Sequence, residues 1–452
     1  REIAFAISLR PVARSGMRVK MRILELTQEN RKDLLDNLLK RSPNNYGQYE
    51  AVVADIIRNV REKGDEALFS YTKELDHCEL NAQSLRVTAE EIEAARARVG
   101  EEFLAVMEKS AANIRAFHEK QLRPGWFETK PDGSILGMRL LPVASAGVYA
   151  PGGTAAYPSS VLMNVIPAKV AGVERIVMAT PPGADGKVNA GTLAAASVAG
   201  VDEIYKMGGA QAIAALAFGT QSVPKVDKIT GPGNIFVALA KKACFGYVGI
   251  DSIAGPSEIL VIADETANPR YVAADLLSQA EHDTLASAIL ITTSRRLAEQ
   301  VSEQIDGFLA VLERRDIIKQ SLDNYGYILI APDLDAAAEA ANEIASEHLE
   351  ILTADPFAMM TKIRNAGAIF LGEYSSVPLG DYFAGPNHVL PTNGTARFFS
   401  PLNVDDFMKK TSLISYSRQA LEKAHADIEL FAGREGLTAH ANSIRVRFEQ
   451  ES

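Results

Sequence analysis

The spacing of apolar residues predicts that the first part of the chain is helical. Between about Thr27 and Gln121, apolar side chains recur every three or four residues, which is the period of one helix face. The helical pattern already opens at Met21-Arg-Ile-Leu24. Thr88-Ala-Glu-Glu91 has the form of a capping box, which marks a helix start. Two apolar stripes illustrate the pattern: Leu34, Leu35, Leu38 and Leu39, then Val52, Val53, Ile56, Ile57 and Val60.

The pattern changes near Arg123-Pro124-Gly125 and becomes that of an α/β protein. Residues 135–142 alternate like strands, and later segments repeat a strand, a glycine turn and a helix, which is typical of parallel sheets. We therefore predict an α/β fold of two incomplete Rossmann-like parallel-sheet domains with small helical N- and C-terminal segments. The predicted strands are 147–149, 175–179, 203–205 and 228–229 in one set, and 258–262, 289–293, 327–330 and 369–371 in the other. Predicted helices of the second set are 271–283, a helix ending near 313, and 335–347, and the tail from Asp405 is predicted to be helical.

Four glycine turns follow predicted strands of the first set. They are 150–153, 182–183, 208–211 and 231–234. Such turns lie at the carboxyl ends of strands, where open sheets bind ligands and backbone N–H groups can meet phosphate. None has the form G-x-G-x-x-G, so a standard dinucleotide fingerprint is absent, and the pattern alone leaves open whether these glycines bind a nucleotide or only turn the chain.

Composition narrows the function classes. A chain of 452 residues exceeds the usual size of one hydrophobic core, so two or more domains are expected. The net charge of -10 argues against a nucleic-acid partner, since such partners are held by phosphate neutralisation. Only Cys78 and Cys244 are present, which excludes a disulfide scaffold and suits the cytoplasm. No apolar run is long enough for a membrane span, so no membrane partner is expected. Residues 1–20 are interpreted as leader sequence.

Candidate chemistry is scattered along the second half of the chain. Gln279 and His282 are three residues apart, so they share one face if the predicted helix continues through them. Imidazole is the commonest side-chain metal ligand, but a solvated, capped helix end explains this pair equally simply. The other candidates are the adjacent pair Glu347-His348, Asp381 in a glycine-flanked loop, and Glu435 with His440 near the C-terminus. Because carboxylate and imidazole are the usual oxygen and nitrogen ligands of zinc, residue type alone would favour Glu281 or Asp283 over the Gln279 amide as a zinc ligand.

The amino-acid sequences of seven segments are similar to those of one protein family. They are Gly147-Val-Tyr-Ala-Pro-Gly-Gly153, Gly231-Pro-Gly-Asn234, Ala254-Gly-Pro-Ser-Glu258, Ser278-Gln-Ala-Glu-His-Asp283, Ser346-Glu-His-Leu349, Gly385-Pro-Asn-His-Val-Leu-Pro391 and Leu437-Thr-Ala-His440. In this combination and order, from about Met21 to Arg447, the chain resembles the histidinol dehydrogenases. The resemblance implies an NAD-dependent zinc enzyme that oxidises L-histidinol through L-histidinaldehyde to L-histidine, in two hydride transfers.

The resemblance also implies roles for individual residues. It assigns the single zinc ion to Gln279, His282, Asp381 and His440, and overrides the preference for a carboxylate. It adds Ser257, His348 and Glu435 as substrate contacts, beside the metal ligands, and it places NAD contacts at Tyr149, Gln211 and Asn234. His348 is expected to take the hydroxyl proton, and Glu347 to activate the water that adds to the aldehyde. A covalent route through a cysteine is rejected, because neither Cys78 nor Cys244 occupies a matched segment. His388 is expected to be structural.

The family members are homodimers whose C-terminal segment crosses to the partner, so Glu435 and His440 are expected to complete the neighbouring site. The predicted domains are an N-terminal helical segment at 21–43, a discontinuous α/β domain at 44–148 and 259–402, an NAD-binding domain at 149–258, and a dimerisation segment at 403–452. A connection between Asn234 and Ser257 that is shorter than expected raises the question of how the cofactor groove closes. The alternatives are a related zinc/NAD dehydrogenase acting on another polar alcohol, such as a sulfonated diol, and, from other classes, a zinc hydrolase or a nucleotide-binding regulatory protein.

Overall fold

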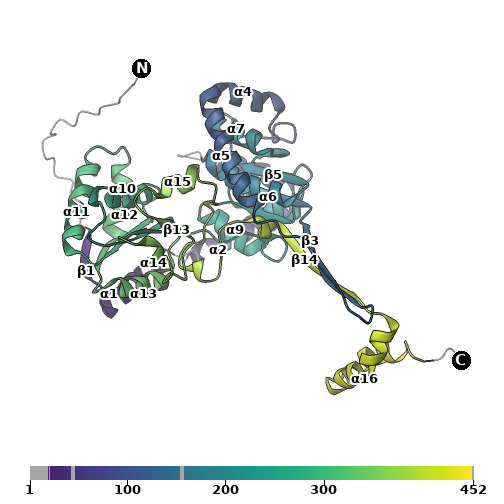
Figure 1. Cartoon of the computed structure of the whole chain (residues 1–452). Helices are drawn as coiled ribbons and strands as arrows, with labels where there is room; N and C mark the ends of the chain where they lie inside the picture. Colours follow the sequence, from purple (N-terminus) through teal and green to yellow (C-terminus); the bar gives the residue numbers. More distant parts are fainter. Residues whose placement is uncertain (1–18, 20, 42–45, 153–156, 450–452) are drawn as a thin grey trace.

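The computed structural model describes residue 19 and residues 21–41, 46–152 and 157–449. The predicted leader, apart from residue 19, and Gly153 of the first glycine turn lie outside the described residues. The described part contains two α/β bodies side by side and a long antiparallel arm (Figure 1).

The first body is built on a parallel six-stranded sheet. Its strand order is β1 (Arg22–Glu25), β11 (Gly326–Ile330), β10 (Ser287–Thr292), β9 (Glu258–Ala263), β12 (His348–Leu352) and β13 (Ala368–Leu371). Alternate residues of the central strands face opposite layers. Ile259 and Val261 pack with α10 (Pro269–Ala280), α11 (Arg295–Leu309) and α12 (Arg315–Tyr325). Leu260 and Ile262 pack with α1 (Gln28–Leu39), α13 (Leu334–Ile344) and α14 (Pro356–Met360). Because both faces are covered, the central strands are apolar on both sides.

The second body is built on a parallel five-stranded sheet. Its order is β6 (Glu203–Lys206), β5 (Arg175–Thr180), β4 (Ser145–Tyr149), β7 (Lys228–Thr230) and β8 (Gly249–Ile250). Helices α6 (Pro158–Ala171) and α7 (Ala190–Ala199) cover one face, and α8 (Gly209–Phe218) and α9 (Ile235–Cys244) cover the other. The N-terminal helices form an outer layer on this body. Helices α2 (Gly47–Lys63) and α3 (Asp65–Leu75) pack on the α8 side, and α4 (Ala89–Val99) and α5 (Glu101–Glu119) pack on the α7 and α6 side.

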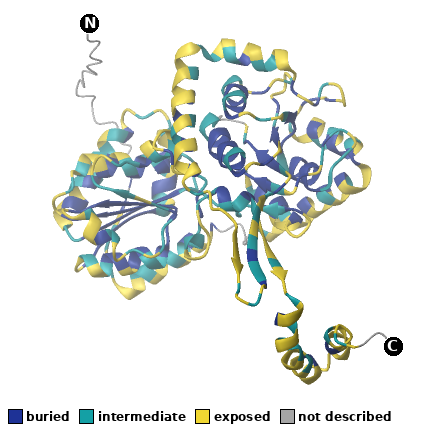
Figure 2. Cartoon of the chain, turned by 45° about the vertical axis from the view of Figure 1, so that its right-hand side comes forward, coloured by how far each residue is buried: buried dark blue, intermediate teal, exposed yellow. Residues whose placement is uncertain are grey.

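An antiparallel arm leaves the second body and ends in the C-terminal helices. Strand β3 (Ile135–Pro142) pairs with both β2 (Trp126–Thr129) and β14 (Met408–Ser415). The arm carries α16 (Arg418–Arg434) and α17 (Thr438–Arg445) away from both bodies (Figure 1). Large apolar side chains on it are exposed, including Ile414, Leu430 and Phe431 at 75%, 62% and 69%, and the exposed colour dominates these helices in Figure 2.

The predicted fold class is confirmed, since both predicted sets of parallel strands form sheets. Four local predictions were wrong. The helix predicted at 271–283 ends at Ala280, so His282 and Asp283 lie beyond it. Residues 22–25 form a strand instead of a helix, because they extend the six-stranded sheet by pairing with β11. Residues 408–415 form a strand instead of a helix, because all eight pair with β3. The helix predicted to end at Glu347 ends at Ile344, where Ala345 turns the chain at φ 50°, and His348 begins a strand that had not been predicted.

The packing groups some segments differently from the predicted domain ranges. Residues 47–119 contact helices of the five-stranded body, although the predicted ranges placed 44–148 with 259–402. The remaining short elements are α15 (Val377–Tyr382) and the 3-10 turns η2 (Thr395–Arg397) and η3 (Val404–Phe407). None of the helices in the described ranges is both long and apolar enough to cross a membrane.

Candidate active site

A cavity of about 640 Å³ lies between the two bodies and collects most of the predicted site residues. From the five-stranded body, it is lined by the turns that follow β4 and β7, which are carboxyl ends of strands. From the six-stranded body, it is lined by residues that immediately precede β9 and β12, which are amino ends. Ser257, Gln279, His282, Glu347, His348, Asp381 and Asn234 all line it.

The end of α10 supplies Gln279 and His282. Gln279 lies in the last turn of the helix and is 1% exposed, and its Oε1 atom has no hydrogen-bond partner among the described residues. His282 lies two residues beyond the helix, where its backbone N–H donates to the carbonyl of Gln279. Its ring stacks at 6.5 Å on the ring of Tyr157. The amide oxygen is therefore buried without compensation, and such an atom normally has a partner.

Asp381 on α15 faces the same cavity and is surrounded by imidazoles. Its Oδ1 atom lies 3.7 Å from Nε2 of His348 and 4.0 Å from Nδ1 of His388. Burial alone would raise the pKa of Asp381, but His348, His388 and His282 outweigh burial and hold this pKa below its usual value. His388 also bonds the Asp381 carbonyl through Nδ1 at 2.9 Å and the hydroxyl of Ser160 through Nε2 at 3.1 Å. These two bonds agree with the structural role expected for His388.

Glu347 and His348 lie at the start of β12, and one residue of β9 holds both. Nδ1 of His348 donates to the carbonyl oxygen of Glu258 at 2.9 Å, while the backbone N–H of Glu258 donates to Oε2 of Glu347 at 2.8 Å. The first bond puts the proton on Nδ1, so Nε2 of the neutral ring is an acceptor, and this atom is buried without a hydrogen-bond partner in the described chain. Burial alone would lower the pKa of His348, but the Glu347 and Asp381 carboxylates outweigh burial and raise it well above its ordinary value.

Three of the four predicted zinc ligands meet in this cavity, and the fourth does not. His440 is exposed on α17, and Glu435 is exposed at the end of α16, the helix at the far end of the arm in Figure 1. Within the described residues of one chain, no group of three or more His, Cys, Asp or Glu side chains is placed to hold a metal ion. Gln279, His282 and Asp381 nevertheless offer oxygen and nitrogen donors that suit zinc, and the unpartnered Oε1 of Gln279 fits a bound cation.

The three predicted NAD contacts lie in two places. Asn234 is exposed at the cavity, where its side chain caps α9 by accepting from the N–H groups of Phe236 and Val237. Tyr149 and Gln211 are buried and do not line the cavity. The Tyr149 hydroxyl accepts from the N–H of Gly209, and burial raises the pKa of Tyr149 to about 12. Gln211 donates to Asp76, and its Oε1 atom has no partner in the described structure.

A buried ion pair fixes the glycine turn beside Asn234. Lys241 pairs with Asp251, and both side chains are at most 5% exposed. Lys241 also donates to the carbonyl of Gly231, and Asp251 accepts from its N–H. Gly231 has φ 113°, and an added Cβ would lie 2.2 Å from the backbone oxygen of Tyr149, so only glycine fits there.

Neither cysteine belongs to the site. Cys78 and Cys244 are buried outside the residues that line the cavity, and burial raises the pKa of Cys244 to about 12. A thiol with so high a pKa is a poor nucleophile. The rejection of a covalent cysteine route is consistent with this placement.

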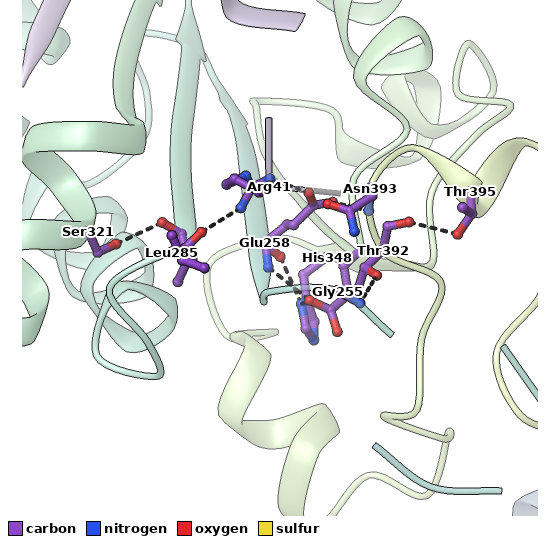
Figure 3. Close-up of polar contacts among 11 residues, drawn as sticks. Arg41, Gly255, Glu258, Leu285, Ser321, His348, Thr392, Asn393 and Thr395 are labelled. Carbon is purple, nitrogen blue, oxygen red and sulfur yellow. Dashed lines mark hydrogen bonds and ion pairs between the residues drawn. The ribbon is translucent and has the colours of Figure 1, made fainter. Parts of the chain in front are cut away.

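Three buried ionisable residues around the site and one half-buried one were missed by the sequence analysis. Arg41 and Glu258 form an ion pair close to His348 (Figure 3). The carboxyl groups of Asp275 on α10 and Glu350 on β12 influence each other electrostatically, and Glu350 accepts from the N–H of Val377, the first residue of α15. The signal that could have revealed Glu258 and Glu350 is a charged residue inside an apolar strand, as in Glu258-Ile-Leu-Val-Ile and His348-Leu-Glu-Ile-Leu. Arg41 and Asp275 lie outside the strands and carry no such signal.

Comparisons with known proteins identify the family to which the chain belongs. The family model described as histidinol dehydrogenase matches residues 39–448. A histidinol dehydrogenase from Halalkalibacterium halodurans is 59% identical over 399 residues, which cover 88% of this chain and 94% of that protein. The chain belongs to the histidinol dehydrogenase family. The family member from Heliobacterium mobile is 55% identical over 415 residues, covering 92% of this chain and 97% of its own length. The crystal structure of histidinol dehydrogenase from Elizabethkingia anophelis has a TM-score of 0.90 at 36% identity and covers 96% of this chain and 99% of its own. The resemblance noted from seven short segments is thereby confirmed.

Proposed function

We propose that this member of the histidinol dehydrogenase family oxidises L-histidinol through L-histidinaldehyde to L-histidine, the last steps of histidine biosynthesis, with NAD as hydride acceptor and one zinc ion per subunit. The observation that carries the proposal is the unpartnered Oε1 of Gln279, which lines one cavity with His282, Asp381 and the Glu347-His348 pair. The same cavity is therefore lined by donors that can bind a metal ion, by a base and by a carboxylate. Family membership supplies the substrate.

His348 is the proton acceptor in the first oxidation. Its Nδ1 atom is committed to the Glu258 carbonyl, so Nε2 is the atom that can take the hydroxyl proton of the alcohol. The ring is 4% exposed, so few water molecules compete for that atom. A general base in such a position is typically worth about 10² to 10⁴ in rate.

Glu347 prepares the second oxidation. One of its oxygens accepts from the Glu258 N–H, and the carboxylate lines the cavity beside His348. It removes a proton from the water that adds to the aldehyde carbon, while His348 returns its proton to the aldehyde oxygen, which gives the hydrated aldehyde and leaves His348 neutral again. His348 then takes the proton of the hydrate when the second hydride leaves.

Gln279, His282 and Asp381 would hold zinc from one chain, together with His440 of the second chain. When bound, zinc supplies a Lewis acid that orients the amino alcohol, and NAD supplies the hydride acceptor. We place NAD against the Asn234 turn, with Tyr149 and Gln211 behind it, and Ser257 beside the substrate.

The arm is proposed to complete the site of a second copy of the chain. It holds His440 and Glu435 away from its own cavity, and it exposes Leu430 and Phe431, which a solitary chain would leave in water. A homodimer with exchanged arms would bury these side chains and bring His440 to the zinc and Glu435 to the substrate of its neighbour. Two buried, free cysteines suit the cytoplasmic location that we also propose.

The test is to mix purified protein with L-histidinol and NAD and to follow NADH absorbance. We expect two NADH per histidinol consumed. One NADH per histidinol with released aldehyde would contradict the two-step reaction. Activity on a sulfonated diol without activity on histidinol would favour the related polar-alcohol dehydrogenase.

A further inference from the structure

The peptide of Glu258 is the common support of the predicted catalytic pair. Its N–H holds Glu347, and its carbonyl holds Nδ1 of His348. The position of this peptide therefore sets the orientation of both groups, and whatever fixes residue 258 also fixes them.

The side chain of Glu258 is fixed by a buried ion pair. Arg41 approaches within 2.5 Å of Oε1, and the two side chains are 0% and 4% exposed. The other carboxylate oxygen accepts from the N–H of Asn393 at 3.3 Å. Figure 3 shows Arg41, Glu258, His348 and Asn393 meeting at this point from separate segments.

Arg41 also reaches the loop that follows the predicted metal ligand His282. Its guanidinium donates to the carbonyl of Leu285 at 2.8 Å. A buried guanidinium presents several donors in one plane, which lets it bond two acceptors at fixed directions. One side chain thus joins the loop of the predicted metal ligands to the residue that holds the catalytic pair.

We propose that Arg41 and Glu258 are positioning residues, which set the geometry of Glu347 and His348 and connect it to the His282 loop. Arg41 lines the cavity but is 1% exposed, and its guanidinium is bonded to Glu258 and Leu285, so it acts through these contacts and not through the substrate. The proposal rests on the proposed function in that it takes Glu347 and His348 as the catalytic pair. A buried pair of opposite charges is by itself weak evidence of added stability, so its contact with the residue that holds Glu347 and His348 indicates a geometric role.

The test compares Arg41→Met with Lys241→Met, which removes the cation of the other buried ion pair. Both lose a buried cation, but the Lys241 pair fixes the Gly231 turn at the proposed cofactor site. We expect Arg41→Met to lower kcat by about 10- to 100-fold, because a displacement near 1 Å has that effect, while KM for NAD stays within about twofold. Lys241→Met should instead raise KM for NAD by about tenfold. Arg41→Lys, which keeps the charge but not the planar fork, should recover part of kcat.

A second measurement needs no turnover. Diethyl pyrocarbonate modifies neutral imidazoles, and peptide mass spectrometry reports the rate at each histidine. Loss of the anchor should raise the rate at His348 at least about threefold in Arg41→Met and in Glu258→Gln, whereas the rate at exposed His77 should not change. This measurement stands even if the wild-type protein proves inactive with histidinol, so a wrong substrate and a wrong positioning role give different results.

Three outcomes would overturn the proposal. The first is that folded Arg41→Met and Glu258→Gln have the same kcat and the same rate of His348 modification as the wild-type protein. The second is that Arg41→Met and Lys241→Met change kcat and KM in the same way, each in proportion to its loss of thermal stability. This result would mean that both ion pairs have only a structural role. The third applies if Arg41→Met does not fold, in which case Arg41→Lys and Glu258→Gln are tested instead. Wild-type kcat and a wild-type rate of His348 modification in both of these variants would overturn the proposal.

Discussion

Nε2 of His348 lies 3.7 Å from Oδ1 of Asp381, so the proposed base and a proposed metal ligand face each other across the cavity. The two side chains come from β12 and α15, and neither distance nor direction follows from their separation in sequence. Their proximity, together with the adjacent Glu347, determines the charge state of the imidazole before any ligand binds.

The first prediction concerns the pH at which His348 becomes a base. Its pKa is raised because Glu347 and Asp381 outweigh burial, so the neutral ring appears only as the pH rises through that raised value. We expect His348 in metal-free protein to be modified by diethyl pyrocarbonate only above its ordinary pKa. Glu347→Gln should move the midpoint to lower pH, because it removes the strongest of the charges that raise it. An unchanged midpoint in this variant would mean that another group controls the imidazole.

The second prediction separates the two oxidations. Glu347→Gln leaves His348 in place but removes the carboxylate proposed to activate water, so the second step should slow more than the first. We expect aldehyde to accumulate and to be captured by an added hydrazine, and the yield of NADH per histidinol to fall from two towards one. His348→Asn should instead slow the first step by about 10² to 10⁴ without accumulation of aldehyde. Equal slowing of both steps by Glu347→Gln would contradict its assigned role.

The third prediction concerns the metal. Removal of metal by a chelator should abolish oxidation of histidinol, and zinc should restore it. Asp381→Asn should lower the zinc content measured by mass spectrometry, because it exchanges a charged ligand for a neutral one. Asp283→Asn is the matched control, since Asp283 lines the same cavity but accepts from the N–H of Leu285. Full activity in protein shown to lack transition metals would remove the basis of the mechanism.

The fourth prediction concerns the buried carboxyl pair. Burial raises the pKa of Asp275 to about 6, and burial together with Asp275 raises that of Glu350 well above its usual value. The folded chain therefore keeps protons that the unfolded chain loses, so stability falls as the pH rises from the ordinary carboxyl range through the raised values. Glu350→Gln retains an acceptor for the Val377 N–H and removes this dependence. We expect its melting temperature to rise relative to wild type at pH 8 and to change little at pH 5. A constant difference at both pH values would mean that the pair does not share a proton.

The fifth prediction concerns the exchanged arm. His282→Ala and His440→Ala subunits should each be inactive alone. Mixed under conditions that allow exchange, they should form heterodimers with one intact site and recover a measurable part of the activity. Two different tags on the subunits would show by co-purification that exchange has occurred. Absence of recovery in proven heterodimers would place His440 with its own chain or outside the site.

The sequence predicted the layers of the fold better than the location of the reactive groups. Apolar runs such as Ile259 to Ile262 indicated central parallel strands, because both faces of these strands are covered. The edge strand at 22–25 was misjudged, since four residues carry too little pattern to separate a strand from a helix. Strand β14 was misjudged because it is mostly exposed and depends on its pairing with β3, which no local pattern contains.

The site was harder to predict for a geometric reason. The rule that open sheets bind ligands at carboxyl ends applies to the turns after β4 and β7. Glu347 and His348, in contrast, precede or begin a strand and so lie at an amino end, where the rule gives no guidance. Gln279 was chosen only through family resemblance, since an amide is chemically the weaker candidate. The support from Arg41 through Glu258 depends on contacts between residues 217 positions apart, which no motif contains.

The pairing of β1 with β11 has a consequence for biosynthesis of the chain. Arg22 and Tyr327 are 305 residues apart and are register partners in the finished sheet. At about 5 to 20 residues per second, a ribosome needs roughly 15 to 60 seconds to make the second strand after the first has emerged. During that interval, the nascent Ile23 and Leu24 have no edge to join, so a chaperone that shelters the first strand should increase the yield of folded enzyme.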